Sequence, residues 1–216
     1  MLLCGVDEAG RGPVIGPLVF GAVVVDKDTE GKFKEMGVTD SKLIDPATRE
    51  TLAKEIQKLA TEYKVLSLSP VEITEWMKTA SLNDIEAIKT AELLESLDSK
   101  FNVLYVDSPD TMPARYGQNI RNLCKKDCKI ISEHKADLNH TVVGAASILA
   151  KVVRDTEIRE LARLYGDIGS GYPSDEVTQR WLDDHWKKNH NFPEFVRKKW
   201  STVTRRAQLK LGEWNG

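Results

Sequence analysis

The segment from residue 141 to residue 164 constrains the fold more than any other part of the chain. Its first half is small and apolar on every side of a helix, through Val142, Val143, Gly144, Ala145, Ala146, Ile148, Leu149, Ala150 and Val152. A helix that is hydrophobic all round is buried. The chain therefore needs other layers of secondary structure to cover this helix.

Short apolar runs between glycine- and proline-rich turns predict a sheet. Strands are expected at residues 2–6, 18–25, 65–68, 103–106 and 129–132, with a further strand after Gly31 and before Gly37. Helical spacing of apolar residues predicts helices at residues 46–60 and 83–97, and a helix start at Ser69. The order passes from antiparallel hairpins to alternating strands and helices. We therefore expect an α/β fold in which a mixed sheet is flanked by helices.

The pattern changes after Gly166. A loop is expected at residues 169–173, followed by a helix that starts near Asp175 and runs through Trp181 and Trp186. We predict an α/β domain at residues 1–168, a helical C-terminal subdomain at residues 169–206 and a tail at residues 207–216.

Composition excludes several classes of protein. Hydrophobic residues make up 41% of the chain and charged residues 30%, which is typical of a globular protein. No apolar run approaches the roughly 20 residues of a membrane helix, and Asp7 brings a charge too early for a signal peptide. We therefore expect a cytoplasmic protein without a membrane partner. No dimerisation stripe is visible, so we expect a monomer.

Cysteine and histidine usage argues against disulfides and zinc. The three cysteines are an odd number in a chain without a secretion signal. The four histidines form no HExxH motif, and no second pair accompanies Cys124 and Cys128 at zinc-finger spacing. We expect free thiols.

Basic residues gather near the C-terminus although the net charge of the chain is −2. Between residues 187 and 210 the only acid is Glu194, and the basic residues are Lys187, Lys188, Arg197, Lys198, Lys199, Arg205, Arg206 and Lys210. A solvated helical face explains such a run, and a phosphate-binding surface is the alternative.

Acidic residues follow strands at separate places in the sequence. Asp7 ends the first predicted strand and Glu8 follows it, Asp107 ends the strand at 103–106, and Asp137 comes after the strand at 129–132. A single Asp after a strand is most often a turn or cap residue. Three or four carboxylates around one sheet edge instead indicate a site for Mg²⁺ or Mn²⁺. These ions prefer oxygen ligands, and their charge offsets the repulsion between the carboxylates. Two such ions roughly 3.5–4 Å apart can clamp a phosphodiester.

The glycines after Glu8 invite a second interpretation, a dinucleotide-binding loop. That motif needs GxGxxG at the start of a helix, whereas here a strand follows Gly10, Gly12 and Gly16. We reject it. A glycine-rich loop with one Arg can instead approach a sugar-phosphate backbone closely.

Blocks along the whole chain resemble type 2 ribonuclease H, and the archaeal branch is the most similar. They are residues 5–13 (GVDEAGRGP), 40–42 (DSK), 105–107 (YVD), 134–137 (HKAD), 145–152 (AASILAKV) with Arg154 and Asp155, and 169–175 (GSGYPSD). The match runs from residue 1 to about residue 206, and the DEAGRGP block is highly specific. The resemblance implies an RNase H-like catalytic domain at residues 1–168.

The resemblance also implies an activity and a set of site residues. The enzyme would be an endonuclease that cuts the RNA strand of RNA/DNA hybrids and the phosphodiester 5′ of ribonucleotides embedded in DNA, leaving a 3′-hydroxyl and a 5′-phosphate. That activity would serve ribonucleotide and RNA-primer removal in DNA replication and repair. Catalysis would use two Mg²⁺ or Mn²⁺ ions, and the metal ligands would be Asp7, Glu8, Asp107 and Asp137.

Substrate contacts are implied in the same way. The loop of Gly10, Arg11 and Gly12 would recognise the 2′-hydroxyl, Tyr172 would stack near the next sugar, and phosphates would meet Lys42, Ser147 and Lys151. An exposed turn residue is the alternative for Lys42, and a packing aromatic residue is the alternative for Tyr172. We leave Asp155 out of the site, because a salt bridge to Arg154 or Arg159 explains it.

The tail adds one more hypothesis. Gln208, Leu211 and Trp214 stand at i, i+3 and i+6, similar to the peptide by which replication proteins dock on the sliding clamp, although the usual second aromatic residue is replaced by Asn215. Two other functions stay open at this point. One is a DNA nuclease of the same fold, and the other is a non-catalytic hybrid-binding module.

Overall fold

The computed structural model describes residues 1–212, and their side chains as far as residue 208. Its sheet consists of β1 (Leu2–Ala9), β2 (Leu18–Asp26), β3 (Glu62–Leu68), β4 (Val103–Asp107) and β5 (Lys129–Glu133). The helices are α1 (Lys27–Glu35), the 3₁₀ turn η1 (Ser41–Leu43), α2 (Pro46–Leu59), α3 (Pro70–Trp76), α4 (Leu82–Glu95), α5 (Pro113–Leu123), α6 (Ala136–Asn139), α7 (Thr141–Tyr165), α8 (Glu176–Asn189) and α9 (Ser201–Gly212).

The sheet is mixed, as the sequence predicts, and its strand order is β3-β2-β1-β4-β5. β1 and β2 pair antiparallel, while β4 runs parallel to both β1 and β5. Parallel pairing places the ends of β1, β4 and β5 at the same edge of the sheet. The predicted α/β class is therefore confirmed.

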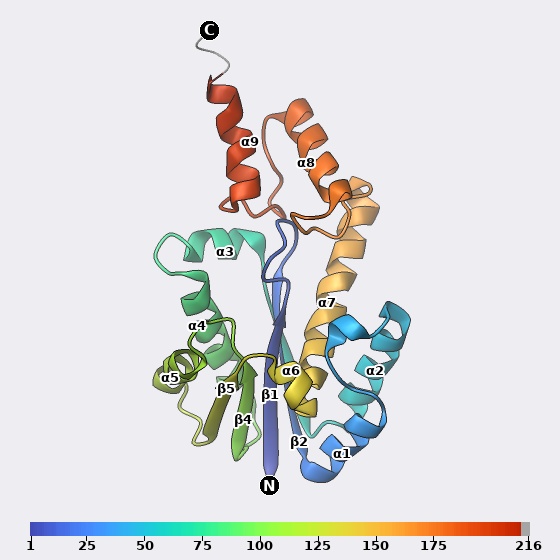
Figure 1. Ribbon diagram of the computed structural model, residues 1–216, viewed down its shortest axis with the longest axis vertical. Coiled ribbons are helices and arrows are strands. Elements are labelled where there is room, and N and C mark those ends of the chain that lie inside the picture. Colours follow the sequence, from blue (N-terminus) through green and yellow to red (C-terminus); the bar gives the residue numbers. More distant parts are fainter. Residues whose placement is uncertain (213–216) are drawn as a thin grey trace. The chain divides into compact units, whose positions relative to one another are not determined.

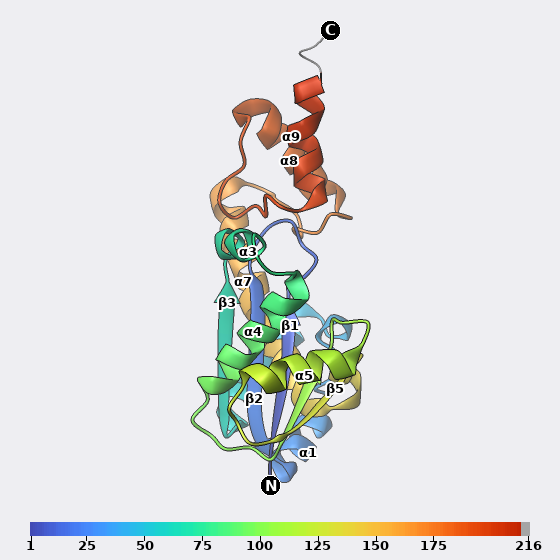
Figure 2. The same ribbon diagram turned by 90° about the vertical axis from the view of Figure 1, so that its left-hand side faces the viewer.

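Helices cover both faces of this sheet. In Figures 1 and 2, α4 and α5 lie on one face, and the first half of α7 lies on the other with α1 and α2 beside it. The contact of α7 is very close, because a Cβ at Gly5 would lie 2.3 Å from the Val142 carbonyl oxygen and one at Gly21 would lie 2.4 Å from that of Ala146. The small, buried residues of α7 thus explain the pattern that the sequence shows.

Two expectations about local structure are wrong. The strand expected between Gly31 and Gly37 belongs to α1, whose N-terminus is capped when the Asp26 carboxylate accepts the Thr29 N–H at 2.8 Å. Helix α1 buries only Phe33, so its sequence lacks a clear helical stripe. The first strand does not stop at Asp7 either, because pairing with β2 continues to Ala9.

Helix α5 was not predicted. Its buried residues Tyr116, Gly117 and Ile120 have helical spacing, and Pro113 stands in its first turn. These signals are typical of a helix.

The chain forms two compact units that interleave along the sequence. The first contains residues Met1–Ala9, Val19–Ser67 and Ala80–Val153, and the second contains Gly10–Leu18, Leu68–Thr79 and the chain from Arg154 onward. Each unit has its own apolar core; that of the second includes Ile15, Ile168 and Leu182. The second unit thus takes in segments that precede residue 169. The division of the chain at residues 168 and 206 stays a prediction.

Among residues 1–212, no helix is both long enough and apolar enough to span a membrane.

Candidate active site

Three aspartates come together at one edge of the sheet in the first unit. Val6 of β1 pairs with Val106 of the parallel strand β4, so Asp7 and Asp107 each follow a residue of the same pair. The Asp107 carboxylate accepts the Ala136 N–H at 2.7 Å, which holds the turn that carries Asp137 against the end of β4. The structure thereby joins acids that the sequence places at separate strand ends.

Asp7 has the most perturbed of these carboxyl groups. Its side chain is only 5% exposed. Burial raises the pKa of Asp7 to about 8, and the charges of Asp107 and Asp137 add to the effect. Hydrogen bonds from Ser147 and from the Glu8 N–H favour the ionised form, with the N–H at 2.8 Å from Oδ1, but they do not offset burial.

The other two aspartates share this environment. Burial raises the pKa of Asp107, and the nearby charge of Asp137 raises it further. The pKa of Asp137 is raised by burial and by the charge of Asp40. The three groups are therefore close enough to oppose one another's ionisation.

This donor set fits a divalent metal by its chemistry. All ligating atoms would be carboxylate oxygens, which Mg²⁺ and Mn²⁺ prefer over the nitrogen and sulfur that zinc takes. A divalent cation would also offset the repulsion that raises the three pKa values. Within residues 1–212, no three Asp, Glu, His or Cys side chains are already grouped tightly enough to hold a metal. The fit thus rests on the type and charge of the donors.

Glu8 differs from the three aspartates. Because β1 stays regular through Ala9, Glu8 points to the face opposite Asp7. Asp7 shares the face of Gly5, which α7 covers. Burial raises the pKa of Tyr116 on α5, and the charges of both Glu8 and Asp7 add to that effect. A role for Glu8 as a metal ligand stays a prediction.

Lys42 is a positively charged residue close to the acid cluster. Desolvation lowers its pKa, but Asp40, Asp137, Asp7 and Asp107 together raise it. Its side chain is 76% exposed and lies 3.9 Å from Asp40. An exposed ammonium beside the carboxylates is well placed to contact a phosphate group.

The buried pair of Ser41 and Ser147 holds the Asp7 carboxylate by a hydrogen bond. The Ser147 hydroxyl lies 2.9 Å from that of Ser41, and it also hydrogen bonds to the Asp7 carboxylate. Ser41 was not identified from the sequence, although it stands inside the DSK block. Ser147 is 3% exposed, so its surroundings favour holding Asp7 over contacting a phosphate. Lys151 follows one turn later on α7 and is half-buried. Phosphate contacts by Ser147 and Lys151 stay predictions.

The loop of Gly10, Arg11 and Gly12 belongs to the second unit. Gly10 has a φ of +88°, and a Cβ there would lie 2.5 Å from the Pro17 carbonyl oxygen, so only glycine fits. Gly12 is exposed, and a Cβ there would lie 3.7 Å from the Tyr172 ring. Two segments predicted to contact substrate are thus neighbours.

Tyr172 rests on a buried arginine. The Arg154 guanidinium carbon lies 5.2 Å from the centre of the Tyr172 ring, and its Nη2 donates to the Ser170 carbonyl at 2.6 Å. Its Nη1 donates to Asp155 at 3.1 Å, so the salt bridge expected for Asp155 is confirmed. For Arg154 the sequence suggested only this salt bridge and not the contact with Tyr172, because an Arg on a helix is usually solvent-exposed.

Comparison with known proteins decides the family. The family model described as Ribonuclease HII matches residues 4–203. The chain belongs to the ribonuclease HII family. This confirms the family predicted from the sequence and makes the chain a metal-dependent endoribonuclease.

Individual ribonucleases HII are similar to this chain in sequence and structure over nearly its whole length. The chain is 46% identical to the ribonuclease HII of Pyrococcus abyssi over 98% of this chain and 96% of that protein. The crystal structure of the ribonuclease H2 from Pyrococcus horikoshii superposes with a TM-score of 0.91, at 44% identity over 97% of this chain and 98% of that one. A ribonuclease HII of Archaeoglobus fulgidus, solved as a complex with PCNA, gives a TM-score of 0.83 at 39% identity, covering 93% of this chain and 96% of that one.

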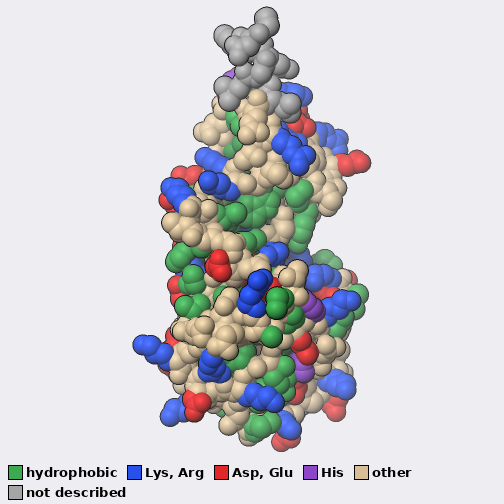
Figure 3. Space-filling model, turned by 60° about the vertical axis from the view of Figure 1, so that its left-hand side comes forward, with side chains coloured by type: hydrophobic (Ala, Val, Ile, Leu, Met, Phe, Trp, Pro, Cys, Tyr) green, Lys and Arg blue, Asp and Glu red, His purple; other side chains and the backbone are tan. Residues whose placement is uncertain are grey.

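The C-terminal region of this ribonuclease HII is basic. On the face drawn in Figure 3, Lys and Arg side chains are spread over the part formed by the C-terminal helices. Of the residues predicted to bind a clamp, Gln208 is exposed at the end of the described side chains. The side chain of Leu211 and all of Trp214 lie outside the described residues.

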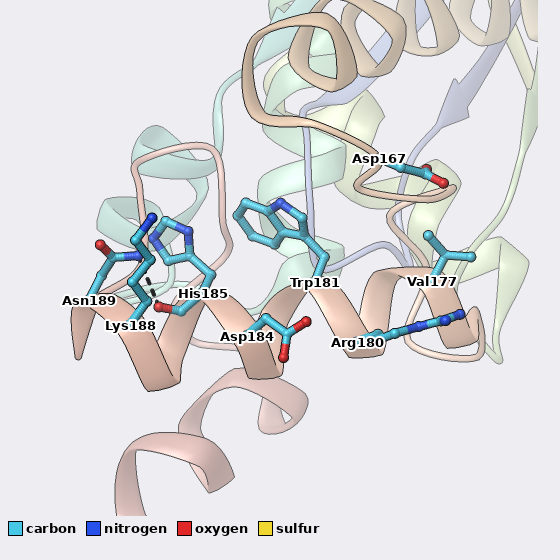
Figure 4. Close-up of a pocket in the computed structure, with 8 residues that line it drawn as sticks. All are labelled: Asp167, Val177, Arg180, Trp181, Asp184, His185, Lys188 and Asn189. Atoms are coloured by element: carbon cyan, nitrogen blue, oxygen red, sulfur yellow. Dashed lines mark hydrogen bonds between the residues drawn. The ribbon is translucent and has the colours of Figure 1, made fainter.

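A surface hollow of about 600 Å³ lies along α8. Figure 4 shows its lining residues, Asp167, Val177, Arg180, Trp181, Asp184, His185, Lys188 and Asn189. None of these belongs to the residues predicted for the active site. Acids and bases are mixed along it, and the Trp181 and His185 rings stack at 4.8 Å. Its chemistry therefore differs from that of the acid cluster.

Proposed function

We propose that this ribonuclease HII hydrolyses the phosphodiester on the 5′ side of a ribonucleotide, in RNA/DNA hybrids and in DNA that contains single ribonucleotides. The products are a 3′-hydroxyl and a 5′-phosphate. The supporting observation is the cluster of Asp7, Asp107 and Asp137. Burial raises the pKa of all three, and neighbouring carboxyl groups raise each pKa further.

Asp7, Asp107 and Asp137, with Glu8 from the opposite face of β1, hold two Mg²⁺ or Mn²⁺ ions in this proposal. Divalent ions held by these acids would supply activation of a water molecule and stabilisation of the charge on the phosphate and the leaving oxygen. The Ser41–Ser147 pair keeps Asp7 in place through its hydrogen bond.

The remaining residues bind and orient the nucleic acid. Lys42 and Lys151, with Ser147 if it leaves its present partners, contact phosphates. The N–H groups of the loop at residues 10–12 meet the 2′-hydroxyl, which is the group that separates RNA from DNA. Tyr172 offers a ring for stacking on the adjacent sugar.

The test offers the protein three labelled duplexes, all DNA, a full RNA/DNA hybrid, and DNA with one ribonucleotide, each with Mg²⁺, Mn²⁺ or EDTA. We expect metal-dependent cutting on the 5′ side of the ribonucleotide and its loss in Asp107→Asn. Cutting of the all-DNA duplex would favour a DNA nuclease. Binding without cutting in any metal would leave a hybrid-binding module.

We further propose that the tail residues Gln208, Leu211 and Trp214 dock on a sliding clamp, as a route to replicating DNA. The relative from Archaeoglobus fulgidus supports this partner, because its structure is a complex with PCNA. The measurement is the affinity of the full chain for an archaeal PCNA ring. Trp214→Ala should weaken binding at least about tenfold if this aromatic residue is an anchor, and unchanged binding would exclude the docking role.

A further inference from the structure

Arg197 is buried in the second unit, with a side chain that is 0% exposed. It lies in the segment between α8 and α9, in the run of basic residues that a solvated surface would explain. Its guanidinium donates three hydrogen bonds to main-chain carbonyl oxygens: Nε to Gly16 at 2.9 Å, Nη1 to Arg11 at 3.0 Å and Nη2 to Gly10 at 2.5 Å. The Arg197 side chain thus holds the loop that follows β1 by hydrogen bonds to its main chain.

Trp200 binds the next carbonyl group of the loop, that of Gly12. Its Nε1 donates to the Gly12 carbonyl at 3.3 Å, and the guanidinium carbon of Arg197 lies 4.9 Å from the centre of its ring. The main chain helps as well, since the Arg197 N–H donates to the Val14 carbonyl at 2.8 Å. The carbonyl groups of Gly10, Arg11 and Gly12 are therefore all held by the same short segment.

This arrangement fixes the direction of the loop's N–H groups. Peptide bonds in residues 1–212 are all trans, so each carbonyl points away from the N–H of the next residue. Because Arg197 binds the carbonyls of Gly10 and Arg11, the N–H groups of Arg11 and Gly12 point away from the buried guanidinium. Gly12 is exposed, and in the proposed function its N–H meets the 2′-hydroxyl.

We propose that Arg197, assisted by Trp200, is a positioning residue for recognition of the 2′-hydroxyl. The inference rests on the proposed function, in which the loop at residues 10–12 meets that hydroxyl. Arginine suits this role because its rigid, planar fork donates in several directions at once. A lysine at the same position would keep the positive charge but could not span the three carbonyl groups.

The test compares Arg197→Lys with Arg206→Lys. Arg206 also donates to main chain, to the Thr202 carbonyl at 2.7 Å, and it pairs with Asp183 at 2.7 Å, but it makes these contacts within the helices α8 and α9. Affinities for a duplex with one ribonucleotide and for the all-DNA duplex of the same sequence are measured in Ca²⁺, together with thermal melting. Cleavage in Mg²⁺ is measured separately.

We expect Arg197→Lys to lower the ratio of the two affinities about tenfold, roughly the effect of misdirecting one hydrogen bond. Affinity for all-DNA duplex should stay within about twofold, since phosphate contacts are retained. Arg206→Lys should leave the ratio unchanged. A folded Arg197→Lys protein that keeps the wild-type ratio overturns the proposal.

If Arg197→Lys does not fold, Trp200→Phe decides, because it removes one donor to the loop and keeps an aromatic ring. A wild-type ratio in that variant also overturns the proposal. Failure of the proposed function is distinguishable, since then the wild-type protein itself would neither prefer nor cut the ribonucleotide.

Discussion

If Asp7 is a metal ligand, as proposed, metal binding by this ribonuclease HII should depend steeply on pH, because a metal ligand must be ionised and Asp7 resists ionisation. The pKa of Asp7 is raised to about 8, first by burial and then by Asp107 and Asp137. Below this value the carboxyl group must lose a proton before it can bind a cation. Each pH unit below 8 therefore costs about 1.4 kcal/mol, or a factor of about ten in apparent affinity.

The numbers follow from simple competition between a proton and the metal. We expect the dissociation constant for Mn²⁺ to be roughly tenfold weaker at pH 7 than at its plateau and roughly a hundredfold weaker at pH 6. Above pH 8 it should level off. The assay counts free Mn²⁺ by electron paramagnetic resonance during titration of the protein, without nucleic acid, at pH 6, 7, 8 and 9.

A histidine could imitate this behaviour, which calls for a control. His134 is close enough to Asp107 for its positive charge to lower the pKa of that aspartate. His134→Gln should keep the slope between pH 6 and 8. A flat profile in the wild-type protein, or a slope that disappears in His134→Gln, would refute the assignment to Asp7.

Three further predictions concern stability and binding. Gly5→Ala should lower the free energy of unfolding by about 3 kcal/mol in urea titrations, because its Cβ would lie 2.3 Å from the Val142 carbonyl oxygen; a loss under about 1 kcal/mol would mean that α7 shifts freely. Lys42→Ala should weaken duplex binding and reduce the slope of log K against log salt by about 1, whereas Lys58→Ala, which removes an exposed partner of Glu55 on α2, should leave the slope unchanged. In EDTA, Asp7→Asn should melt above the wild type at pH 8.5, with the difference shrinking toward pH 4. The sign follows because the pKa of the Asp7 carboxyl is raised in the folded state. Such a group stabilises the protein at low pH, and this stability is lost as pH rises from about 4 through 8. Equal melting temperatures of the two proteins at pH 8.5 would contradict this reasoning.

Much of the fold could be predicted because local patterns and the fold agree. The all-apolar first half of α7 signalled burial, and the structure explains its small residues by the close approach of Gly5 and Gly21. Where local signals were weak, prediction failed. Helix α1 buries Phe33 alone, and a single buried residue has no period.

The sequence predicted a set of acids for the site but not their geometry. Acids after strands indicated a shared edge, and parallel pairing of β1 with β4 does bring Asp7 and Asp107 side by side. The expected end of the first strand at Asp7 was wrong, because the glycines that suggested a break come only after Ala9. The orientation of Glu8 depends on that register, and a shift of one residue reverses the face.

Arg197 illustrates a different limit. In the sequence it stands beside Lys198 and Lys199, and a run of cations is usually a solvated surface. Its burial depends on contacts with residues more than 180 positions earlier, such as Gly10 and Arg11. No local pattern carries that information, whereas a buried guanidinium with three carbonyl partners is unmistakable in three dimensions.

The acid cluster of the first unit and the loop at residues 10–12 of the second unit therefore differ in how they are stabilised. In the first unit Asp7, Asp107 and Asp137 oppose one another's ionisation, and a bound cation would offset the repulsion that helps to raise their pKa values. In the second unit the loop at residues 10–12 has its carbonyl groups bound internally by Arg197 and Trp200, so it needs no ligand to take its shape. It follows that variants of the acid cluster should alter metal dependence and the rate of the chemical step. Variants of Arg197 should instead alter which nucleotide is chosen, with metal dependence retained.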